Sequence, residues 1–452
     1  MSKSNSTRTR TDTQKSLIFD PRQWFFNSEV SAAILLLIAS LSAVFWANSV
    51  AAKSYTDLLH TEISIFFGKF LISHSLRYWI NDGLMTLFFF TVGLEIKREV
   101  LVGELASIKK AMLPIFAAAG GMVLPAGIYL ALNHGTTGAA GWGVPMATDI
   151  AFSLGAIALI GRGLPVGLRL FLTAFAIADD LGAVIIIAVF YTQHIAWNYV
   201  LVATLFLLCL YLANRFETQS LPVYIFLGAG AWIAAMGSGI HPTIAGVLVA
   251  LLIPAQGRYP TRQFVAEVKT IMDDFQCHDT ACDDMNNILL NSGHLAAVHS
   301  LELACHHVET PLQRLEHALH PFVVFLILPL FALGNAGLSM KGMTVSGSIG
   351  HPVTLGIILG LFVGKPIGIT LFSYIAVRTG LASLPEEVEW VHVMGAGLLG
   401  GIGFTMSLFI SGLAFASPEL LDCSKLGILL GSILSLIAGS VLLVWRCKKK
   451  KA

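Results

Sequence analysis

Charged residues are scarce in this chain of 452 residues. Asp, Glu, Lys and Arg make up only 12 % of it, whereas hydrophobic residues make up 55 %. A soluble globular chain carries about 25 % charged residues, and half that complement cannot cover a compact globule of this size with polar surface. The composition therefore argues against a large soluble enzyme, a nucleic-acid-binding protein and a disordered chain.

Motifs for disulfide, metal or nucleotide chemistry are also lacking. The six cysteines lie far apart and predict no disulfide framework. One polar segment combines Cys277, Cys282, Cys305, His306 and His307, but its first spacing is Cys-x₄-Cys and no second close cysteine pair follows. A solvated acidic loop is therefore favoured over a zinc site. The absence of a Gly-x₄-Gly-Lys-Ser/Thr loop disfavours an ATP-driven pump, and we expect no cofactor.

Long apolar runs are what the chain has instead. A hydrocarbon core about 30 Å thick requires about 20 apolar residues in a helix. Twelve runs reach or approach this length, and they start at Val30, Tyr78, Ala111, Gly143, Leu170, Tyr199, Leu221, Ile240, Pro321, Val353, Trp390 and Leu426. The sequence therefore predicts an all-α polytopic membrane protein with about 12 transmembrane helices. The run from Ile240 is short, and we interpret it as a span of its own.

The placement of Lys and Arg agrees with an even number of spans. We place the N-terminus in the cytoplasm and let successive segments between spans alternate between the two sides of the membrane. The cytoplasmic segments then hold 22 Lys and Arg residues and the outer segments hold five. The remaining Lys lies within a span. The outer five are Lys53, Lys69, Arg77, Lys341 and Lys425. This asymmetry is the one that the positive-inside rule requires, so we expect both termini in the cytoplasm. The polar start of the chain does not have the pattern of a cleaved signal peptide.

The runs divide the chain into five parts. We expect an N-terminal cytoplasmic arm over 1–29, eight spans over 30–255, a cytoplasmic insert over 256–318, four spans over 319–445 and a basic cytoplasmic tail over 446–452. Residues 51–77 carry alternating apolar patches around Gly68, which predicts a short hairpin on the outer side.

Four ionisable residues lie well inside apolar runs: Asp149, Asp179, Asp180 and Lys365. A charge at the bilayer centre costs at least about 2.5–3.5 kcal/mol, so such residues usually face a cavity or a partner. One Lys is available for three Asp residues, so at least one carboxylate is left without a cation. This surplus favours ion transport over a purely structural role.

Asp179 and Asp180 are adjacent, and neighbours on a helix point about 100° apart. One carboxylate can therefore line a water-filled route while the other turns to a neighbouring helix. Burial and mutual repulsion both favour the protonated form of a carboxyl group. A carboxylate that titrates toward neutral pH can exchange its proton for a hard cation such as Na⁺, which oxygen ligands suit by analogy with hard divalent ions.

Three stretches of irregular backbone accompany these charges. Pro145 precedes Asp149, Pro366 follows Lys365, and residues 395–407 are too rich in Gly for a regular helix. Such backbone at membrane depth is tolerated only where it is buried in protein or lines a cavity. Broken helices point dipole ends into the membrane. Asp149 beside two N-termini and Lys365 beside two C-termini would neutralise them.

At these residues the chain resembles the NhaA-type sodium/proton antiporters. Six strings occur in the order of the family: VGLEIKRE at 92–99, ATDIAF at 147–152, ADDLGA at 178–183, RLEHALHP at 314–321, GKPIG at 364–368 and GIGFTMS at 401–407. The resemblance implies an inverted-repeat transporter with two interrupted, crossing helices, an architecture of which this family is a known example.

The resemblance also assigns roles to single residues. Asp180 becomes the main carboxylate for Na⁺ and H⁺, Asp179 pairs with Lys365, and Asp149 and Thr148 belong to the crossing. The cluster linked to pH control comprises Glu95, Glu99, Glu316, His317 and His320. His241, at an expected outer helix end, is interpreted as a satisfied interface histidine, with a titrating role left open because imidazole changes charge near neutral pH.

The activity that the resemblance implies is electrogenic, pH-regulated export of Na⁺ or Li⁺ in exchange for more than one proton. It implies residence in the bacterial inner membrane, with lipid around the chain, no nucleic-acid partner and a homodimer whose contacts include an outer hairpin. The loop before Arg314 and the N-terminal arm are longer than is usual in the family, and both departures bear on regulation.

Two other functions are weighed against transport. An intramembrane aspartyl protease also uses two carboxylates, but it carries Tyr-Asp and Gly-x-Gly-Asp motifs, whereas the Asp residues here follow Thr148, Ala178 and Asp179. A cation channel would need no set of proton-competent Asp and Lys residues at one depth. Antiport is therefore the preferred hypothesis.

Overall fold

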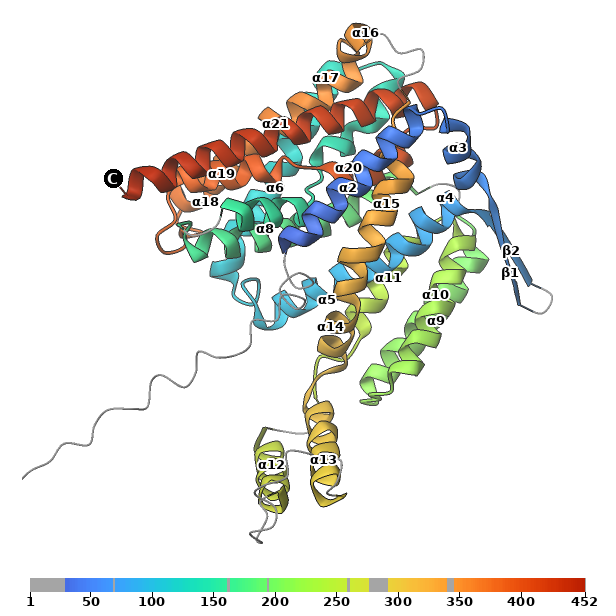
Figure 1. Ribbon diagram of the computed structural model, residues 1–452, viewed down its shortest axis with the longest axis vertical. Coiled ribbons are helices and arrows are strands. Elements are labelled where there is room, and N and C mark those ends of the chain that lie inside the picture. The colour runs from blue at the N-terminus through green and yellow to red at the C-terminus, as the bar shows by residue number, and fades with distance from the viewer. Residues whose placement is uncertain are drawn as a thin grey trace, which may run out of the picture.

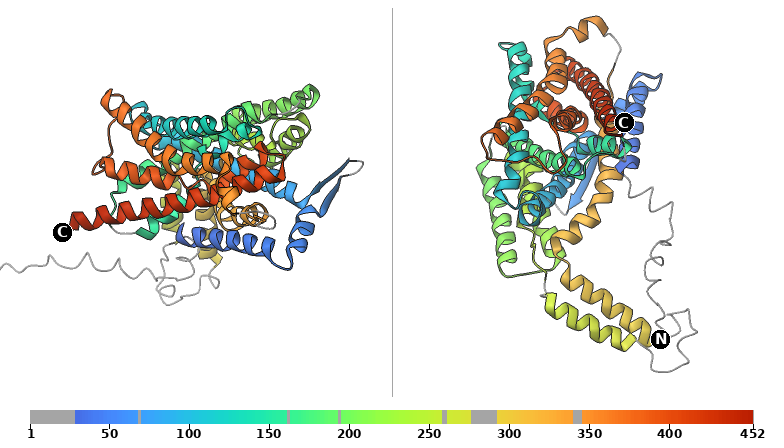
Figure 2. Two further views of the ribbon diagram at one scale, coloured as in Figure 1. Left: turned by 90° about the horizontal axis from the view of Figure 1, so that it is seen from above. Right: turned by 90° about the vertical axis from the view of Figure 1, so that its left-hand side faces the viewer.

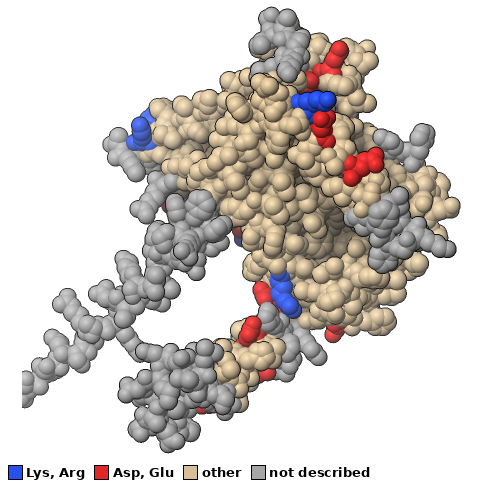
Figure 3. All heavy atoms as spheres, turned by 45° about the vertical axis from the view of Figure 1, so that its right-hand side comes forward, with Lys and Arg blue, Asp and Glu red and all other residues tan. Residues whose placement is uncertain are grey.

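The computed structural model describes residues 29–67, 70–160, 163–192, 195–257, 261–275, 292–339 and 345–451. This part of the chain is almost wholly helical, with helices packed in a bundle from which one hairpin of strands projects (Figure 1). The face in Figure 3 is nearly free of charged side chains, which lie toward its ends. An uncharged belt of this kind is what contact with a hydrocarbon core requires.

Eight helical segments in the described residues are long and apolar enough to cross a membrane. They are α2 (Glu29–Asn48), α6 (Ile108–Asn133), α8 (Val166–Phe190), α9 (Trp197–Arg215), α10 (Leu221–Ser238), the α14–α15 segment (Pro311–Asn335), the α17–α18 segment (Pro352–Arg378) and α21 (Pro418–Lys451). The α14–α15 and α17–α18 segments each contain one widened π-helical turn, η4 (Val323–Ile327) and η5 (Gly360–Gly364).

Two further spans are broken in the middle. The 3₁₀ helix η2 (Thr137–Met146) meets α7 (Ile150–Ile160) at a bend of 41°, and α19 (Trp390–Gly400) meets α20 (Phe404–Ala414) at a bend of 47°. These interruptions fall in the stretches where the sequence predicts irregular backbone. Counting each bent pair as one span gives ten candidate spans.

The remaining two predicted runs form helices that pack on each other. They are α5 (Met85–Val102), which continues the π-helical turn η1 (Trp79–Leu84), and α11 (Pro242–Leu252). A Cβ added to Gly93 would lie only 2.7 Å from the Cβ of Ala250, so the two helices approach closely. Gly239, with φ +82°, ends α10 in the left-handed conformation that favours glycine. The run from Ile240 is therefore a helix of its own, but with 11 residues it is shorter than the candidate spans, so its expected role as a span stays a prediction. All twelve runs have a helical counterpart among the described residues.

Residues 51–77 form α3 (Ala52–His60), the antiparallel strands β1 (Glu62–Phe67) and β2 (Phe70–Ser75), and the short helix α4 (Leu76–Tyr78). The strand pairing runs from Glu62 opposite Ser75 to Phe67 opposite Phe70. The hairpin extends away from the bundle beside α4 (Figure 1). A small helix, α16 (Val345–Ile349), precedes the α17–α18 segment.

The segment predicted as an insert contains two helices, α12 (Thr261–Phe275) and α13 (Ser292–Val308), packed on each other. Ile271, Ala297 and Ala304 are the buried residues of their small shared core. Figure 2 shows this pair extending beyond the main bundle. The insert ends earlier than expected, because residues 311–318 already belong to α14 (Pro311–Phe322). Cys277 and Cys282 lie outside the described residues, and Cys305 is exposed.

The two ends of the chain differ from the expectation in one respect. The basic tail predicted over 446–452 continues α21 to Lys451 rather than leaving it. The predicted arm over 1–29 lies outside the described residues except for Glu29, the first residue of α2.

Two contacts of α6 position the helices that carry the intramembrane charges. A Cβ on Gly120 of α6 would lie 2.2 Å from the carbonyl oxygen of Gly368 in α18 (Lys365–Arg378), so these two backbones touch. Between α6 and α8, by contrast, the flexible side chain of Met122 in α6 contacts Gly182 in α8. The α6–α18 contact thus joins backbone to backbone, whereas the α6–α8 contact at Gly182 passes through a side chain that can change rotamer.

Candidate ion-binding site

The two broken spans meet at their breaks, within the bundle. The amide of Asp149 donates a hydrogen bond to the carbonyl oxygen of Ile402 over 2.6 Å, and the Thr148 hydroxyl donates to the carbonyl oxygen of Gly400 over 3.0 Å. Ser153 and Ser407 add side-chain hydrogen bonds between the same pair of spans, to the carbonyl oxygens of Leu399 and Val144. Backbone groups freed by each break are therefore satisfied by the other span.

Glycine is required where the breaks cross. A Cβ on Gly401 would lie 2.4 Å from the carbonyl oxygen of Leu361, and one on Gly403 would lie 3.0 Å from that of Ala147. The first distance leaves no room for a side chain unless the backbone moves, and the second is tighter than an ordinary van der Waals contact. The Gly-rich composition of this segment thus serves close approach as well as the interruption of the helix.

Asp149 connects the starts of two helices. Its Oδ1 accepts a hydrogen bond from the amide of Phe152 in the first turn of α7, over 3.2 Å. Its Oδ2 accepts from the amide of Thr405 in the first turn of α20, over 3.0 Å, and from the Thr405 hydroxyl over 2.6 Å. The side chain is buried. A carboxylate in this place counters the partial positive charge at both helix N-termini.

Lys365 lies at the junction of η5 and α18 and is fully buried. Its ammonium donates to Asp179 Oδ2 over 2.9 Å and also to the carbonyl oxygen of Met146, the last residue of η2. Only one of the two helix C-termini that we expected is thus in contact with Lys365. The carbonyl oxygen of Gly400, at the end of α19, accepts from Thr148 instead.

Asp180 faces a different environment from its neighbour Asp179. It lines a cavity of about 210 Å³, together with Thr148, Asp149 and Thr405. Its Oδ2 atom is buried and has no hydrogen-bond partner among the described residues. Asp179 does not line this cavity. The angular separation of adjacent helical residues therefore directs one carboxylate to Lys365 and the other to the cavity.

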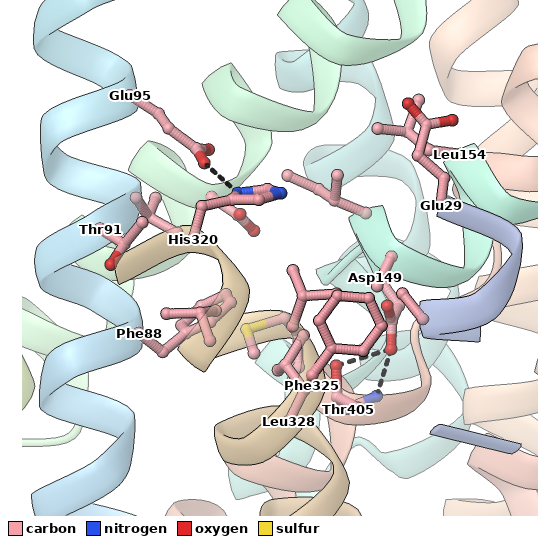
Figure 4. A pocket seen from close by; sticks show the side chains of 18 of the residues that line it. Glu29, Phe88, Thr91, Glu95, Asp149, Leu154, His320, Phe325, Leu328 and Thr405 are labelled. Carbon is pink, nitrogen blue, oxygen red and sulfur yellow. Dashed lines mark hydrogen bonds and ion pairs between the residues drawn. The ribbon is translucent and has the colours of Figure 1, made fainter. Parts of the chain in front are cut away.

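Figure 4 shows the cavity from close by, with Asp149 and Thr405 hydrogen-bonded on one side and Glu95 facing His320 on the other. His320 Nδ1 lies 3.8 Å from Glu95 Oε1. Glu29, at the start of α2, also lines the cavity and pairs with Arg169 of α8 over 2.5 Å. Carboxylates from α2, α5 and α8, together with Asp149 just before α7, thus surround one hollow that a cation could enter.

The residues expected to control pH response meet at one end of α5 and α14. Arg98 pairs with Glu316 and, over 3.2 Å, with Glu99. His320 joins this end cluster through Glu95. His317 turns away, and its Nδ1 lies 3.4 Å from Oε1 of Glu309, the residue just before the N-cap Thr310. The cluster therefore consists of Glu95, Arg98, Glu99, Glu316 and His320, with His317 at its edge.

His241 lies elsewhere. Its Nε2 is 3.2 Å from Asp82 Oδ1 and its Nδ1 is 2.8 Å from the Thr243 hydroxyl. Asp82 and Glu95 are 13 residues apart, about 20 Å along a helix, so His241 is remote from the end cluster. Its ring nitrogens have partners, in agreement with a satisfied histidine.

Sequence reasoning missed several polar side chains of the crossing, above all Thr405, Ser153 and Ser407. One signal was present for Thr405 and Ser407, because both follow a run of glycines that interrupts a helix. No group of three or more His, Cys, Asp and Glu side chains in the described ranges could hold a resident metal ion.

Buried charges beside broken helices are rare in membrane proteins and mark routes for ions or protons. The fold and this site together define an integral-membrane transporter. Comparison with known proteins gives the family: residues 23–443 match the family model described as Na⁺/H⁺ antiporter 1, and the chain belongs to this family.

Curated relatives match along nearly their whole lengths. The chain is 46 % identical over 423 residues to the Na⁺/H⁺ antiporter NhaA 1 of Saccharophagus degradans, covering 93 % of this chain and 90 % of that protein. It is 45 % identical over 432 residues to NhaA 2 of Syntrophotalea carbinolica, covering 96 % and 98 % of the two chains. The protein is thus a multi-pass membrane transporter rather than an enzyme, and an intramembrane protease is no longer an alternative.

Proposed function

We propose that this chain exports Na⁺ or Li⁺ across the bacterial inner membrane in exchange for more than one proton per cation, with Asp180 as the group that binds cation and proton in turn. The observation that carries this proposal is the contrast between two adjacent carboxylates. Asp179 is held by Lys365 at 2.9 Å, whereas Asp180 has no ion-pair partner in the described part of the chain and lines the cavity, which Asp179 does not. Each of the two carboxylates has one oxygen without a hydrogen-bond partner among these residues, but only that of Asp180 belongs to a residue that lines the cavity.

Competition at Asp180 supplies the coupling. A carboxylate that holds Na⁺ is deprotonated, and one that holds a proton cannot also coordinate the cation. Entry of Na⁺ therefore expels the proton, and protonation releases Na⁺. Nearby oxygens for the cation come from Asp149, Thr148 and Thr405, which line the same cavity.

The extra proton is assigned to Lys365. A cation that binds at Asp180 adds a positive charge beside the Asp179–Lys365 pair in a poorly hydrated site, where like charges repel strongly. Loss of a proton from Lys365 relieves this repulsion and makes the exchange electrogenic. Asp149 and Lys365 then also serve to neutralise the helix ends at the two breaks.

The proposed orientation places the termini, the α12–α13 insert and the end cluster in the cytoplasm, as the distribution of Lys and Arg favours. Glu95, Glu99, Glu316 and His320 would then stand between the cytoplasm and the cavity, where their charge sets how readily cations enter. We propose pH control at this place, with His317 at its margin, and a homodimer that uses the projecting β1–β2 hairpin.

Replacement of Asp180 by Asn tests this function. Asp180→Asn keeps the shape of the side chain but removes its charge and titration, so Na⁺-induced collapse of a proton gradient in everted membrane vesicles should disappear. Asp273→Asn, an exposed site in α12, is the matched control and should behave as the wild type. Asp180→Glu should retain weakened exchange with altered apparent Na⁺ affinity. Exchange at the wild-type rate by Asp180→Asn, at equal expression, would overturn the assignment.

A further inference from the structure

A second cavity, of about 450 Å³, lies away from the ion-binding site, between α3, α4 and the start of α21. Its lining includes three cationic side chains, Lys53, Arg77 and Lys425, and one carboxylate, Asp422. These come from elements far apart in the sequence that gather at the same end of the bundle (Figure 1). The volume falls in the range of about 300–1,000 Å³ that is typical of small-ligand sites.

The gathering is unexpected because this end of the bundle has few cations. Only five Lys and Arg residues occur in the segments that the sequence predicts on the outer side of the membrane, and three of these five line this one cavity. The other two, Lys69 and Lys341, lie outside the described residues. The positive-inside rule disfavours Lys and Arg in the outer segments of a membrane protein. Three such residues at one cavity therefore indicate that their positive charge binds something there.

Lys425 is the most deeply placed of the three, with 7 % of its surface exposed. Its ammonium donates a hydrogen bond to the carbonyl oxygen of Gly337 over 2.8 Å, and its other two N–H groups make no hydrogen bond to the described residues. The Asp422 carboxylate lines the same cavity and attracts both Lys425 and Arg77, although it forms no ion pair with either among the described residues. Three cations therefore face one carboxylate, and a bound anion would offset the remaining positive charge, which is costly to keep partly buried.

The lining and its surroundings indicate what kind of anion fits. Leu59 and Leu421 add apolar surface to the cavity, and Ala47 connects it to α2. Along α2, Leu41 and Phe45 are 60 % and 78 % exposed. A ligand with a charged head and apolar chains would place the head among the three cations and its chains along this exposed helix. A free inorganic anion would leave the apolar part unused.

We propose that this cavity binds the phosphodiester headgroup of an anionic membrane lipid. Arg77 and Lys425 donate charge-assisted hydrogen bonds to the phosphate oxygens, and Lys53 adds a third positive charge at the rim. The lipid then joins α3 and α4, next to the β1–β2 hairpin, to α21 at the opposite end of the sequence. This inference does not depend on the proposed ion exchange.

The test uses the full-length protein purified in a neutral detergent and delipidated. Palmitoyl-oleoyl phosphatidylglycerol is added, and retained lipid is counted by native mass spectrometry while thermal stability is followed in parallel. Palmitoyl-oleoyl phosphatidylcholine is the uncharged comparison. The variant Lys53→Gln/Arg77→Gln removes two cations that are not deeply buried, and Lys269→Gln/Arg378→Gln changes the net charge equally at sites outside the cavity.

The wild type and the Lys269→Gln/Arg378→Gln control should retain phosphatidylglycerol and be stabilised by it. Lys53→Gln/Arg77→Gln should bind it about 30-fold more weakly, as expected for the loss of two cations that each contribute about 1 kcal/mol near a lipid phosphate, while its stability without lipid stays unchanged. If that double variant folds poorly, the single Lys53→Gln variant at the exposed rim replaces it and should weaken binding to a smaller extent.

Three outcomes would overturn the proposal. The first is equal retention of phosphatidylglycerol by the cavity and control variants. The second is no preference for phosphatidylglycerol over phosphatidylcholine. The third concerns the source of the anion: if inorganic phosphate at millimolar concentration stabilises the wild type as much as phosphatidylglycerol does and displaces it, the cavity is a site for a free anion and not for a lipid.

Discussion

The charged groups at the crossing and those of the end cluster differ in how firmly they are held. At the crossing, Asp149, Asp179 and Lys365 are almost fully buried, and their partners are backbone groups, the Thr405 hydroxyl or each other. In the end cluster, the side chains of Arg98 and His320 are 37 % and 60 % exposed, whereas the carboxylates that they contact, Glu316 and Glu95, are 7 % and 21 % exposed. Ion pairs that reach the surface contribute little to stability. In the proposed function, the buried set carries the exchange and the set that reaches solvent adjusts it.

The largest effect is expected when Lys365 loses its charge. Lys365→Met leaves the buried Asp179 carboxylate without its cation, which should lower stability by about 3–5 kcal/mol and abolish exchange. The double variant Lys365→Met/Asp179→Asn should recover much of that stability without recovering exchange. Thermal unfolding in detergent and vesicle exchange assays measure the two quantities. A double variant as unstable as the single one would show that the ion pair is not the cause.

Lys365→Arg separates the charge of Lys365 from its ability to release a proton. Arginine keeps the positive charge but hardly ever releases a proton. If Lys365 carries the extra proton, exchange should be lost while the protein still inserts in the membrane. Residual Na⁺-dependent proton movement across pH 6.5–9 would instead assign Lys365 a mainly structural role.

A smaller effect is expected at Thr405. Thr405→Val removes the hydroxyl that donates to Asp149 over 2.6 Å but keeps the shape of the side chain. Hydrogen bonds to charged groups contribute about 1.5–3 kcal/mol, so the unfolding temperature and exchange should both fall. Ser373→Ala is the control, because the buried Ser373 hydroxyl has no hydrogen-bond partner in the described chain; its stability should be nearly unchanged. Equal effects of the two substitutions would contradict this role of Thr405.

In the end cluster the expected change is in pH profile rather than in maximal rate. Glu316→Gln/His320→Gln removes two titratable members of the cluster and should shift the pH of half-maximal exchange by about one unit. His317→Gln should shift it less, because His317 lies next to Glu309 instead. Exchange is measured at saturating Na⁺ from pH 6.5 to 9. A larger shift from His317→Gln than from the double variant would contradict the assignment.

The smallest effect is expected from removal of the insert. The amide of Leu312 donates to the carbonyl oxygen of Pro254 over 3.1 Å, so the two ends of this segment are already adjacent. A short Gly-Ser link in place of residues 261–308 should close the gap at little entropic cost and leave exchange unchanged. A variant that inserts normally but shows no exchange would mean that the α12–α13 pair takes part in transport.

The twelve apolar runs and the four ionisable residues inside them could be predicted from the sequence because both depend on residue type alone. Apolar runs of sufficient length form spans, and the one intramembrane Lys must lie near a carboxylate. What could not be predicted depends on three-dimensional approach. Thr148 satisfies the end of α19 in place of Lys365, and Asp149 is held by Thr405, which is 256 residues away. The early start of α14 escaped prediction because its first turns are amphipathic and carry Arg314 and Glu316.

The backbone contact between Gly120 and Gly368 also limits how the molecule can move. A Cβ on either glycine would lie within 2.2 Å of the carbonyl oxygen of the other, so no larger side chain fits here unless α6 and α18 move apart, and Lys365 lies only three residues before Gly368. The α6–α8 contact passes through the flexible Met122 side chain and is the compliant one. A change in the distance between Asp179 of α8 and Lys365 of α18 would therefore meet less steric resistance at the α6–α8 contact than at the α6–α18 contact.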